Sequence, residues 1–386
     1  MANADGHNVQ WKKVRFDEFF SMLPTNTLSR DKLNSQRGAY QNIHYGDVLI
    51  KYPFCLDCDK YDIPYINEDV KFNATEVKDG DVIFADTAED DTVGKCVEVL
   101  NVGDRKIVSG LHTYFCRPKY KLALGYLGFF LNSNHFHDQL LPYIAGSKVS
   151  SVNRTSIART YISFPDSLPA QRRIAAILSA ADKVIEQTRQ LIGKYKSIKQ
   201  GMMEDLLKPK EGWKKVKLGD MGEFYVGGDV DKNCFSPYPT RECKYPIYAN
   251  ALVNEGLYGY SSKYEFDKEA VTITGRGDVG KVFYRKPYFS TIIRLVTLIP
   301  KDSDIDVKFL SYAMSRISFI IESTGVPQLT APQAKKYEVF IPDLPEQRRI
   351  AKILSGIDRK IEAEEKVLEK YEKMKKGLME RLLRKE

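Results

Sequence analysis

The chain has 386 residues, is 43% hydrophobic and 11% aromatic, and carries a formal net charge of +8. Its length and composition allow two or three globular domains with buried cores. No apolar run is long enough to span a membrane and the N-terminus has no signal-peptide core, so we expect a cytoplasmic protein. The six cysteines are irregularly spaced, which favours reduced thiols over a disulfide framework. The positive charge permits a polyanionic partner, although many other proteins carry a similar excess.

The first segment, residues 1–168, is predicted to form a globular domain of short strands and turns. Its runs of β-branched residues are bounded by Gly and Asp, which mark turns. A helix is predicted over 122–141, and the polar loop 146–154 after it carries too many hydroxyl and amide groups for a core. The predicted strands of this segment lie at 44–50, 79–85, 96–100 and 161–164.

A long helix is predicted over 169–208. It begins at the pair Leu168–Pro169, because proline is tolerated in the first turn of a helix. Apolar residues recur on one face at helical spacing, while Lys, Glu and Arg occupy the other face. Such a helix is longer than is typical of globular domains, so it needs a packing partner. The predicted buried stripe consists of Ile174, Ile177, Ala181, Val184, Leu191, Tyr195 and Ile198.

The second half of the chain repeats this order after Pro209 and Gly212, which end the first helix and form a linker. A second globular segment, predicted over 209–344, opens on Trp213 as the first opens on Trp11, and the sequence contains no other tryptophan. This segment is the shorter of the two, and the two copies have diverged most in these globular parts. Its predicted elements are strands at 271–274, 281–284, 295–298 and 337–340 and a helix over 307–323.

The second long helix, predicted over 345–386, is a copy of the first. Residues 171–207 and 347–383 align without a gap, and a spacing near 3.5 residues persists along both apolar stripes. The two helices could each pack on their own domain, but we favour packing on each other as a coiled coil. The second stripe consists of Ile350, Ile353, Ile357, Ile361, Leu368, Tyr371 and Met374.

The chemical motifs in the sequence are incomplete. The segment Gly275–Gly280 has the dinucleotide-binding spacing G-x-G-x-x-G, but a strand is predicted after it. Without a helix N-terminus to bind phosphate, we predict a tight β-turn with Arg276 exposed at its tip. Cys55 and Cys58 form one C-x-x-C pair without a second, so no metal site is predicted. Methyltransferase and phosphate-binding-loop motifs are absent, and we predict a non-catalytic chain.

The order of these segments resembles the specificity subunit of type I restriction-modification systems over essentially the full chain. The resemblance begins with the Leu-Pro-x-Gln-Arg-Arg-Ile sequences that start at Leu168 and Leu344. Ala170 departs from the Glu that usually precedes this Gln, whereas Glu346 keeps it. Further segments that carry the resemblance are 79–90, 94–95, 110–113, 245–248 and 275–281.

This resemblance implies an α+β fold with a pseudo-twofold internal repeat. Two globular mixed α/β target-recognition domains would be separated by two long helices packed as an antiparallel coiled coil. Each domain would read one half of a bipartite, asymmetric target in double-stranded DNA, while the helices set the spacer and dock two methyltransferase subunits. Restriction subunits would complete the complex. S-adenosylmethionine and ATP would bind to those partners, so no cofactor and no membrane contact is expected for this chain.

Polar loops supply the candidate DNA contacts, because guanidinium, ammonium, amide and hydroxyl groups hydrogen-bond to bases and phosphates. Arg172 and Arg348, near the starts of the long helices, are candidates for methyltransferase contact. The alternatives are a non-catalytic coiled-coil scaffold that does not read DNA and a stand-alone modification enzyme. The candidate DNA-binding residues are Arg37, Lys148, Ser150, Asn153, Arg154, Arg241, Asn250, Arg276, Lys281 and Gln328.

Overall fold

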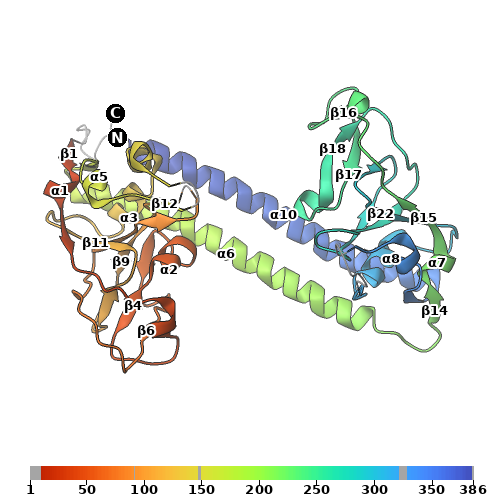
Figure 1. Cartoon of the computed structure of the whole chain (residues 1–386), viewed down its shortest axis with the longest axis horizontal. Helices are drawn as coiled ribbons and strands as arrows, with labels where there is room; N and C mark the ends of the chain where they lie inside the picture. The colour runs from red at the N-terminus through yellow and green to blue at the C-terminus, as the bar shows by residue number, and fades with distance from the viewer. Residues whose placement is uncertain (1–9, 91, 147–148, 321–327, 385–386) are drawn as a thin grey trace. The chain divides into compact units, whose positions relative to one another are not determined.

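The computed structural model describes residues 10–90, 92–146, 149–320 and 328–384. The chain divides into two compact units, one made of residues 1–189 with 366–386 and the other of residues 190–365. Each unit therefore contains one globular segment and part of both long helices (Figure 1). Among the described helices, none combines the length and the apolar character that crossing a bilayer requires.

Unit 1 is built on a five-stranded sheet of order β2-β11-β7-β9-β5 and a four-stranded sheet of order β10-β4-β6-β3. Two further pairs, β1 with β13 and β12 with β8, are antiparallel. The strands are β1 Trp11–Arg15, β2 Phe20–Leu23, β3 Leu33–Asn34, β4 Gln41–Ile43, β5 Cys55–Asp57, β6 Tyr65–Ile66, β7 Val82–Ala85, β8 Thr87–Ala88, β9 Cys96–Leu100, β10 Ile107–Ser109, β11 Thr113–Pro118, β12 Ser150–Ser151 and β13 Tyr161–Pro165.

The helices of unit 1 are short apart from the two long ones that it shares with unit 2. Glu98 on β9 anchors the start of helix α3, because its buried carboxylate accepts hydrogen bonds of 2.8 Å from the backbone N–H groups of Gly125 and Gly128. Burial raises the pKa of Glu98 to about 7. The helices are α1 Phe16–Phe19, α2 Tyr45–Ile50, α3 Tyr126–Leu131, α4 Asn134–His137, α5 Arg154–Ile157 and the start of α6 Leu168–Leu206, with 3-10 turns at Arg30–Lys32 and Leu141–Tyr143.

Unit 2 contains two four-stranded sheets, of order β15-β22-β19-β20 and β16-β18-β17-β21, and the antiparallel pair β14 with β23. Its strands are β14 Lys214–Lys217, β15 Gly222–Val226, β16 Phe235–Ser236, β17 Tyr245–Tyr248, β18 Leu257–Ser261, β19 Ala270–Ile273, β20 Val282–Arg285, β21 Ser290–Thr291, β22 Val296–Pro300 and β23 Glu338–Ile341. Its helices are α7 Leu218–Met221, α8 Val307–Met314, α9 Ala331–Ala334 and the start of α10 Leu344–Leu382, with 3-10 turns at Lys232–Cys234 and Val253–Gly256.

The two units share one topology, which confirms the internal repeat. The order β2-β11-β7-β9 in unit 1 corresponds to β15-β22-β19-β20 in unit 2. In each unit the first strand, which contains or follows the tryptophan, pairs with the last strand before a long helix. The parallel pair β4 with β10 in unit 1 corresponds to the parallel pair β17 with β21 in unit 2, and unit 1 has the further parallel pair β5 with β9.

The long helices α6 and α10 have 39 residues each and begin at the leucine of each Leu-Pro pair, Leu168 and Leu344. In both units the segments of α6 and α10 pair antiparallel. Along α6 the residue numbers of the ion-paired side chains rise, while those of their partners on α10 fall. Lys360 also lies over the ring of Tyr195, 5.7 Å from its centroid. The ion pairs between the helices are Asp182–Lys375 and Arg189–Glu372 in unit 1 and Lys196–Glu365 and Lys199–Asp358 in unit 2.

Each globular core uses the beginning of one long helix and the end of the other. In unit 1, Ile174 and Leu178 of α6 share a core with Leu382 and Leu383 at the end of α10. In unit 2 the two helices exchange these roles. Ile350 and Leu354 near the start of α10 share a core with Leu207 at the end of α6. The stretches of the repeat at the helix ends are therefore core residues of both units.

A buried glutamine fixes the start of each long helix. Gln171 accepts a hydrogen bond from the N–H of Ala123 at 2.8 Å and donates to the carbonyl of Pro165 at 2.7 Å. Gln347 does the same with Asp306 N–H and Pro342 carbonyl, both at 2.9 Å. These bonds explain why both helix starts contain Gln at this position.

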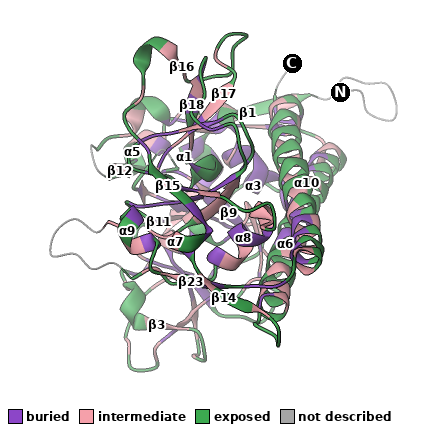
Figure 2. Cartoon of the chain, turned by 90° about the vertical axis from the view of Figure 1, so that its right-hand side faces the viewer, coloured by how far each residue is buried: buried purple, intermediate pink, exposed green. Residues whose placement is uncertain are grey.

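Four residues of the predicted helix-pair stripes are exposed, which contradicts their placement in a buried seam. The exposed fractions are 37% for Ile177, 38% for Val184, 36% for Ile198 and 52% for Met374. On α6 the buried stripe instead passes one residue later, through Leu178, Ile185 and Ile192. The prediction failed because the helix packs on a globular core as well as on its partner. Figure 2 shows the outer faces of both helices as largely exposed.

The remaining stripe residues are at least half-buried. Ile174 and Ile350 lie in the unit cores rather than between the helices. Ile361 is also buried. The half-buried residues are Ala181, Leu191, Tyr195, Ile353, Ile357, Leu368 and Tyr371.

Three predicted secondary-structure elements were wrong. Residues 45–50 form helix α2 rather than a strand, because His44 caps it and Arg30 binds the buried Asp47. The helix predicted over 122–141 is split into α3, α4 and a 3-10 turn. The split occurs where the Asn132 side chain bonds to the backbone carbonyls of Gly128 and Cys96. Helix α8 ends at Met314, and residues 321–323 of its predicted extension lie outside the described residues.

Candidate nucleic-acid interface

The G-x-G-x-x-G segment forms the predicted turn between the antiparallel strands β19 and β20. The backbone of Thr274 donates to the Lys281 carbonyl at 2.9 Å and accepts from Gly280 at 2.8 Å. Gly277 and Gly280 have φ of 67° and 83°, which only glycine adopts without strain. Arg276 is exposed at the tip, and Lys281 is exposed at the base of the same turn.

Asn250 connects this turn to two other loops of unit 2. Its side-chain oxygen accepts a hydrogen bond from the backbone N–H of Gly275 at 2.7 Å. Its side-chain nitrogen donates to the backbone carbonyl of Ile293. One amide therefore holds together the three loops that follow strands β17, β19 and β21.

A fourth loop closes on the turn from the other side. The N–H of Leu329 donates to the carbonyl of Gly275 at 2.9 Å. The guanidinium of Arg276 donates to the side-chain oxygen of Gln328 at 3.2 and 3.4 Å. The structure thus brings together Asn250, Arg276 and Gln328, three of the candidate residues of unit 2, with Lys281 at the base of the turn. Arg241 lies in a separate exposed loop between β16 and β17.

Ile293 and Arg294, which the sequence did not indicate, have backbone strain at this edge. Their φ values are 53° and 59°, which is rare for non-glycine residues and most of all for a β-branched one. Their N–H groups donate to Gly228 and Gly227 at 2.8 and 2.9 Å. Both side chains are exposed. Strain of this kind persists where the surrounding structure enforces it, often at functional sites. No Gly or Asn marks the bend, so no sequence signal reveals it.

The same arrangement recurs in unit 1. The backbone N–H of Ala85 donates to the carbonyl of Lys95, and its carbonyl accepts from the N–H of Gly94, both at 2.9 Å. These bonds correspond to those of Thr274 with Lys281 and Gly280. The N–H of Val152 donates to the carbonyl of Asp86 at 3.0 Å, which matches the bond between Leu329 and Gly275. The turn after β7 and the loop before α5 therefore meet as their counterparts do in unit 2.

Three candidates of unit 1 lie on or beside this loop. Ser150 pairs with Ala88 across the two-stranded sheet β8 with β12. Asn153 caps helix α5 by accepting from the N–H of Ser156 at 2.9 Å, so its side chain has a structural role. The guanidinium of the exposed Arg154 lies 5.5 Å from the ring centroid of Tyr114.

His112 occupies in unit 1 the place that Arg294 has in unit 2, and the sequence prediction missed it. Its φ is 52°. Its Nδ1 lies 3.4 Å from the carboxylate of Asp86, and its ring lies 5.4 Å from that of Tyr45. Arg37 lies elsewhere, exposed and 3.7 Å from Glu68. Lys148 lies outside the described residues.

We call these two surfaces the loop edges. They present exposed or half-buried hydrogen-bonding groups on turns whose backbones are held by other hydrogen bonds. Such groups can contact base edges and phosphates. The loop edge of unit 1 comprises Tyr45, Asp86, His112 and Ser150, and that of unit 2 comprises Asn250, Arg276, Ile293, Arg294 and Gln328.

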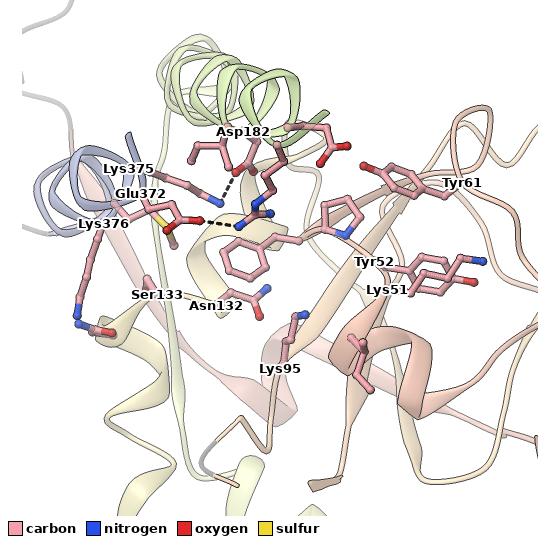
Figure 3. A pocket seen from close by; sticks show the side chains of 18 of the residues that line it. Lys51, Tyr52, Tyr61, Lys95, Asn132, Ser133, Asp182, Glu372, Lys375 and Lys376 are labelled. Carbon is pink, nitrogen blue, oxygen red and sulfur yellow. Dashed lines mark hydrogen bonds and ion pairs between the residues drawn. The ribbon is translucent and has the colours of Figure 1, made fainter. Parts of the chain in front are cut away.

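Each unit also has a cleft between its globular part and the helices. In unit 1 its volume is about 690 Å³, and the ammonium of Lys375 pairs with Asp182 and lies 4.3 Å from the ring centroid of Phe54 (Figure 3). Lys95 donates to the carbonyl of Leu49 at 2.6 Å, and burial lowers its pKa. Lys375 and Lys95 thus have partners within the cleft, which favours a structural role for these two side chains. Within the described residues, no three His, Cys, Asp or Glu side chains are grouped to hold a metal.

Comparison with known proteins gives consistent matches. A protein of Mycoplasma pneumoniae named a type I specificity subunit is 29% identical over 236 residues, 57% of this chain and 64% of its own length. A second one from that organism is matched over only 52% of its length. The chain thus spans less than two thirds of these two relatives. The protein of Methanocaldococcus jannaschii named as the specificity subunit of restriction enzyme MjaX is 28% identical over 337 residues, 79% of this chain and 77% of that protein.

The fold matches a solved structure over nearly its full length. The crystal structure of the S subunit of a type I restriction-modification system from M. genitalium has a TM-score of 0.63 at 18% identity, covering 98% of this chain and 97% of that one. The family model described as the type I restriction modification DNA specificity domain matches residues 8–194 and again residues 210–373. These two ranges correspond to the two copies of the repeat, and the chain belongs to this family.

Proposed function

We propose that this chain is the sequence-specific DNA-recognition subunit of a type I restriction-modification complex, and that each unit reads one half of a bipartite target. The observation that carries the proposal is the recurrence of the loop edge in both units with different side chains. His112 and Asp86 in unit 1 take the places of Arg294 and Gly275 in unit 2. Because hydrogen-bonding groups determine which base edges are read, the two half-sites should differ.

We propose that the chain is non-catalytic and that its partners perform the chemistry. S-adenosylmethionine would bind to methyltransferase subunits and ATP to restriction subunits. Two methyltransferase subunits are expected because the helix sequence that would bind them occurs twice. Reading genomic DNA would place the complex in the cytoplasm.

Exposed apolar residues on the helices support the docking of a partner. In unit 1, Val184 of α6 and Met374 of α10 are 38% and 52% exposed, although they lie on helices with otherwise charged outer faces. Ile177 on α6 and Val367 on α10, each seven residues before one of these, are both 37% exposed. Apolar residues at heptad spacing suit a helix of a methyltransferase subunit. The exposed Arg172 and Arg348, at the helix starts, remain candidates for the same contact.

Replacing Val184 with Asp should weaken binding of the cognate methyltransferase subunit about tenfold or more, because a charge would enter an apolar interface. Isothermal titration measures this affinity. Ser179→Asp provides the control, since it places the same charge on another exposed face of α6. Circular dichroism should show both variants folded. Equal affinities for the two variants would contradict docking at this surface.

The proposal is tested by selecting duplexes from a random library with the assembled specificity and methyltransferase subunits. We expect a bipartite consensus with two different halves and an unspecified spacer of constant length. Affinity for the selected duplex should fall steeply with salt, because phosphate contacts release counterions. A scaffold that does not read DNA would select no consensus. Label transfer from S-adenosylmethionine by the isolated chain would instead indicate a modification enzyme.

A further inference from the structure

A turn with exposed apolar side chains projects beside the loop edge of unit 2. It joins β17 to β18, and its residues Leu252 and Val253 are 42% and 78% exposed. They follow Asn250, the residue that connects three loops of this edge. Leu252 and Val253 therefore form an exposed apolar pair two residues after Asn250.

The turn is held in a strained conformation. Asn254 and Glu255 have φ of 48° and 53°, followed by Gly256 at 83°. A Cβ on Gly256 would lie 2.4 Å from the carbonyl oxygen of Ala249, so only glycine fits there. A positive φ at a non-glycine residue costs conformational free energy, and it persists only where the surrounding structure enforces it.

A buried arginine enforces this conformation. Arg285 is 1% exposed and donates to the backbone carbonyl of Glu255 at 2.6 Å and to the hydroxyl of Thr272 at 2.9 Å. Its guanidinium lies 3.7 Å from the ring centroid of Tyr248. The planar guanidinium thus links the turn to strand β19 and to the end of strand β17. These contacts hold the backbone of the turn at Glu255, two residues after Val253.

The loops of this edge carry both apolar and hydrogen-bonding side chains. Val253 and the 44% exposed Ile293 lie on the two loops that meet at Asn250, while Arg276, Arg294 and Gln328 supply donors. In the major groove of DNA, the groups to be read are hydrogen-bonding atoms and the C5 methyl group of thymine. An apolar side chain on a rigid turn among donors fits that methyl group.

We propose that the half-site read by unit 2 contains an A·T pair whose thymine methyl contacts Val253, and that Arg285 positions this residue. The inference rests on the proposed function and adds one specified base pair to it. Unit 1 has helix α2 in place of this turn, so the contact belongs to one half-site only.

The test uses the duplex selected from the random library, bound by the complex of specificity and methyltransferase subunits. Each thymine of both half-sites is replaced in turn by deoxyuridine, which lacks only the C5 methyl group. At one position of one half-site we expect about fourfold weaker binding, as for one buried methyl group. In Val253→Ala the thymine and deoxyuridine duplexes should bind equally. Val226→Ala, the same change at a 47% exposed position of strand β15, should keep the fourfold difference.

The outcomes separate this inference from the proposed function. Failure to select any consensus would refute the proposed function itself. A consensus without an A·T pair in either half would overturn the inference alone, as would equal binding of thymine and deoxyuridine at every position. A methyl effect that survives in Val253→Ala would assign it to another residue. Arg285→Lys keeps the charge but cannot make both hydrogen bonds. If folded, it should also lose the methyl effect, and retention of the effect would overturn the positioning role of Arg285.

Discussion

Leu383→Ala should destabilise unit 1 by about 2–5 kcal/mol, the range for removing a large buried aliphatic side chain. Leu383 is 1% exposed and lies in the core of unit 1, although more than two hundred residues of sequence separate it from most of that core. The two tryptophans allow the units to be followed separately. In a Trp213→Phe background, denaturation followed by Trp11 fluorescence reports on unit 1. The midpoint of that transition should fall.

Met374→Ala is the matched control, because Met374 lies on the same helix but is 52% exposed. Its effect should remain within about 0.5 kcal/mol. Leu207→Ala, the equivalent change in the other helix copy, should act on unit 2 instead, followed by Trp213 in a Trp11→Phe background. If Leu383→Ala left the transition of unit 1 unchanged, the end of α10 would not be part of its core.

Arg276→Ala should reduce discrimination between bases at one position by about 1–3 kcal/mol, which is roughly fivefold to 150-fold in relative affinity. Arg276 lies at the tip of a rigid turn, and its guanidinium is oriented by Gln328. A guanidinium held in this way can bind the two acceptors of a guanine simultaneously. Competition assays with every single-base variant of the selected duplex measure the change position by position.

Lys281→Ala is the informative comparison, since Lys281 is an exposed cation at the base of the same turn. As a phosphate contact it should weaken all duplexes about equally and reduce the salt slope by about one. A uniform loss for Arg276→Ala, with no change in base preference, would show that Arg276 contacts phosphate rather than a base.

The loop edges could be predicted only in part. The sequence indicated Asn250, Arg276 and Gln328 as candidates because polar residues in turn sequences are usually accessible and carry donors. His112 and Arg294 were missed, since their positive φ values come from contacts with distant loops and have no local signal. The apolar Val253 was missed for a related reason. An isolated valine is ordinarily core, and its exposure depends on how Arg285 holds the turn.

The sequence by itself determined the duplication, the long helices with their Leu-Pro starts, the strands near the globular centre and the family. These features are local or periodic, so neighbouring residues specify them. Only the tertiary structure decided which helix faces are buried. Ile177 and Leu178 are both apolar and adjacent, and the packing of α6 on a globular core as well as on α10 selects Leu178. The end of each long helix likewise packs in a globular core together with the start of the other long helix. No local pattern encodes such a long-range contact.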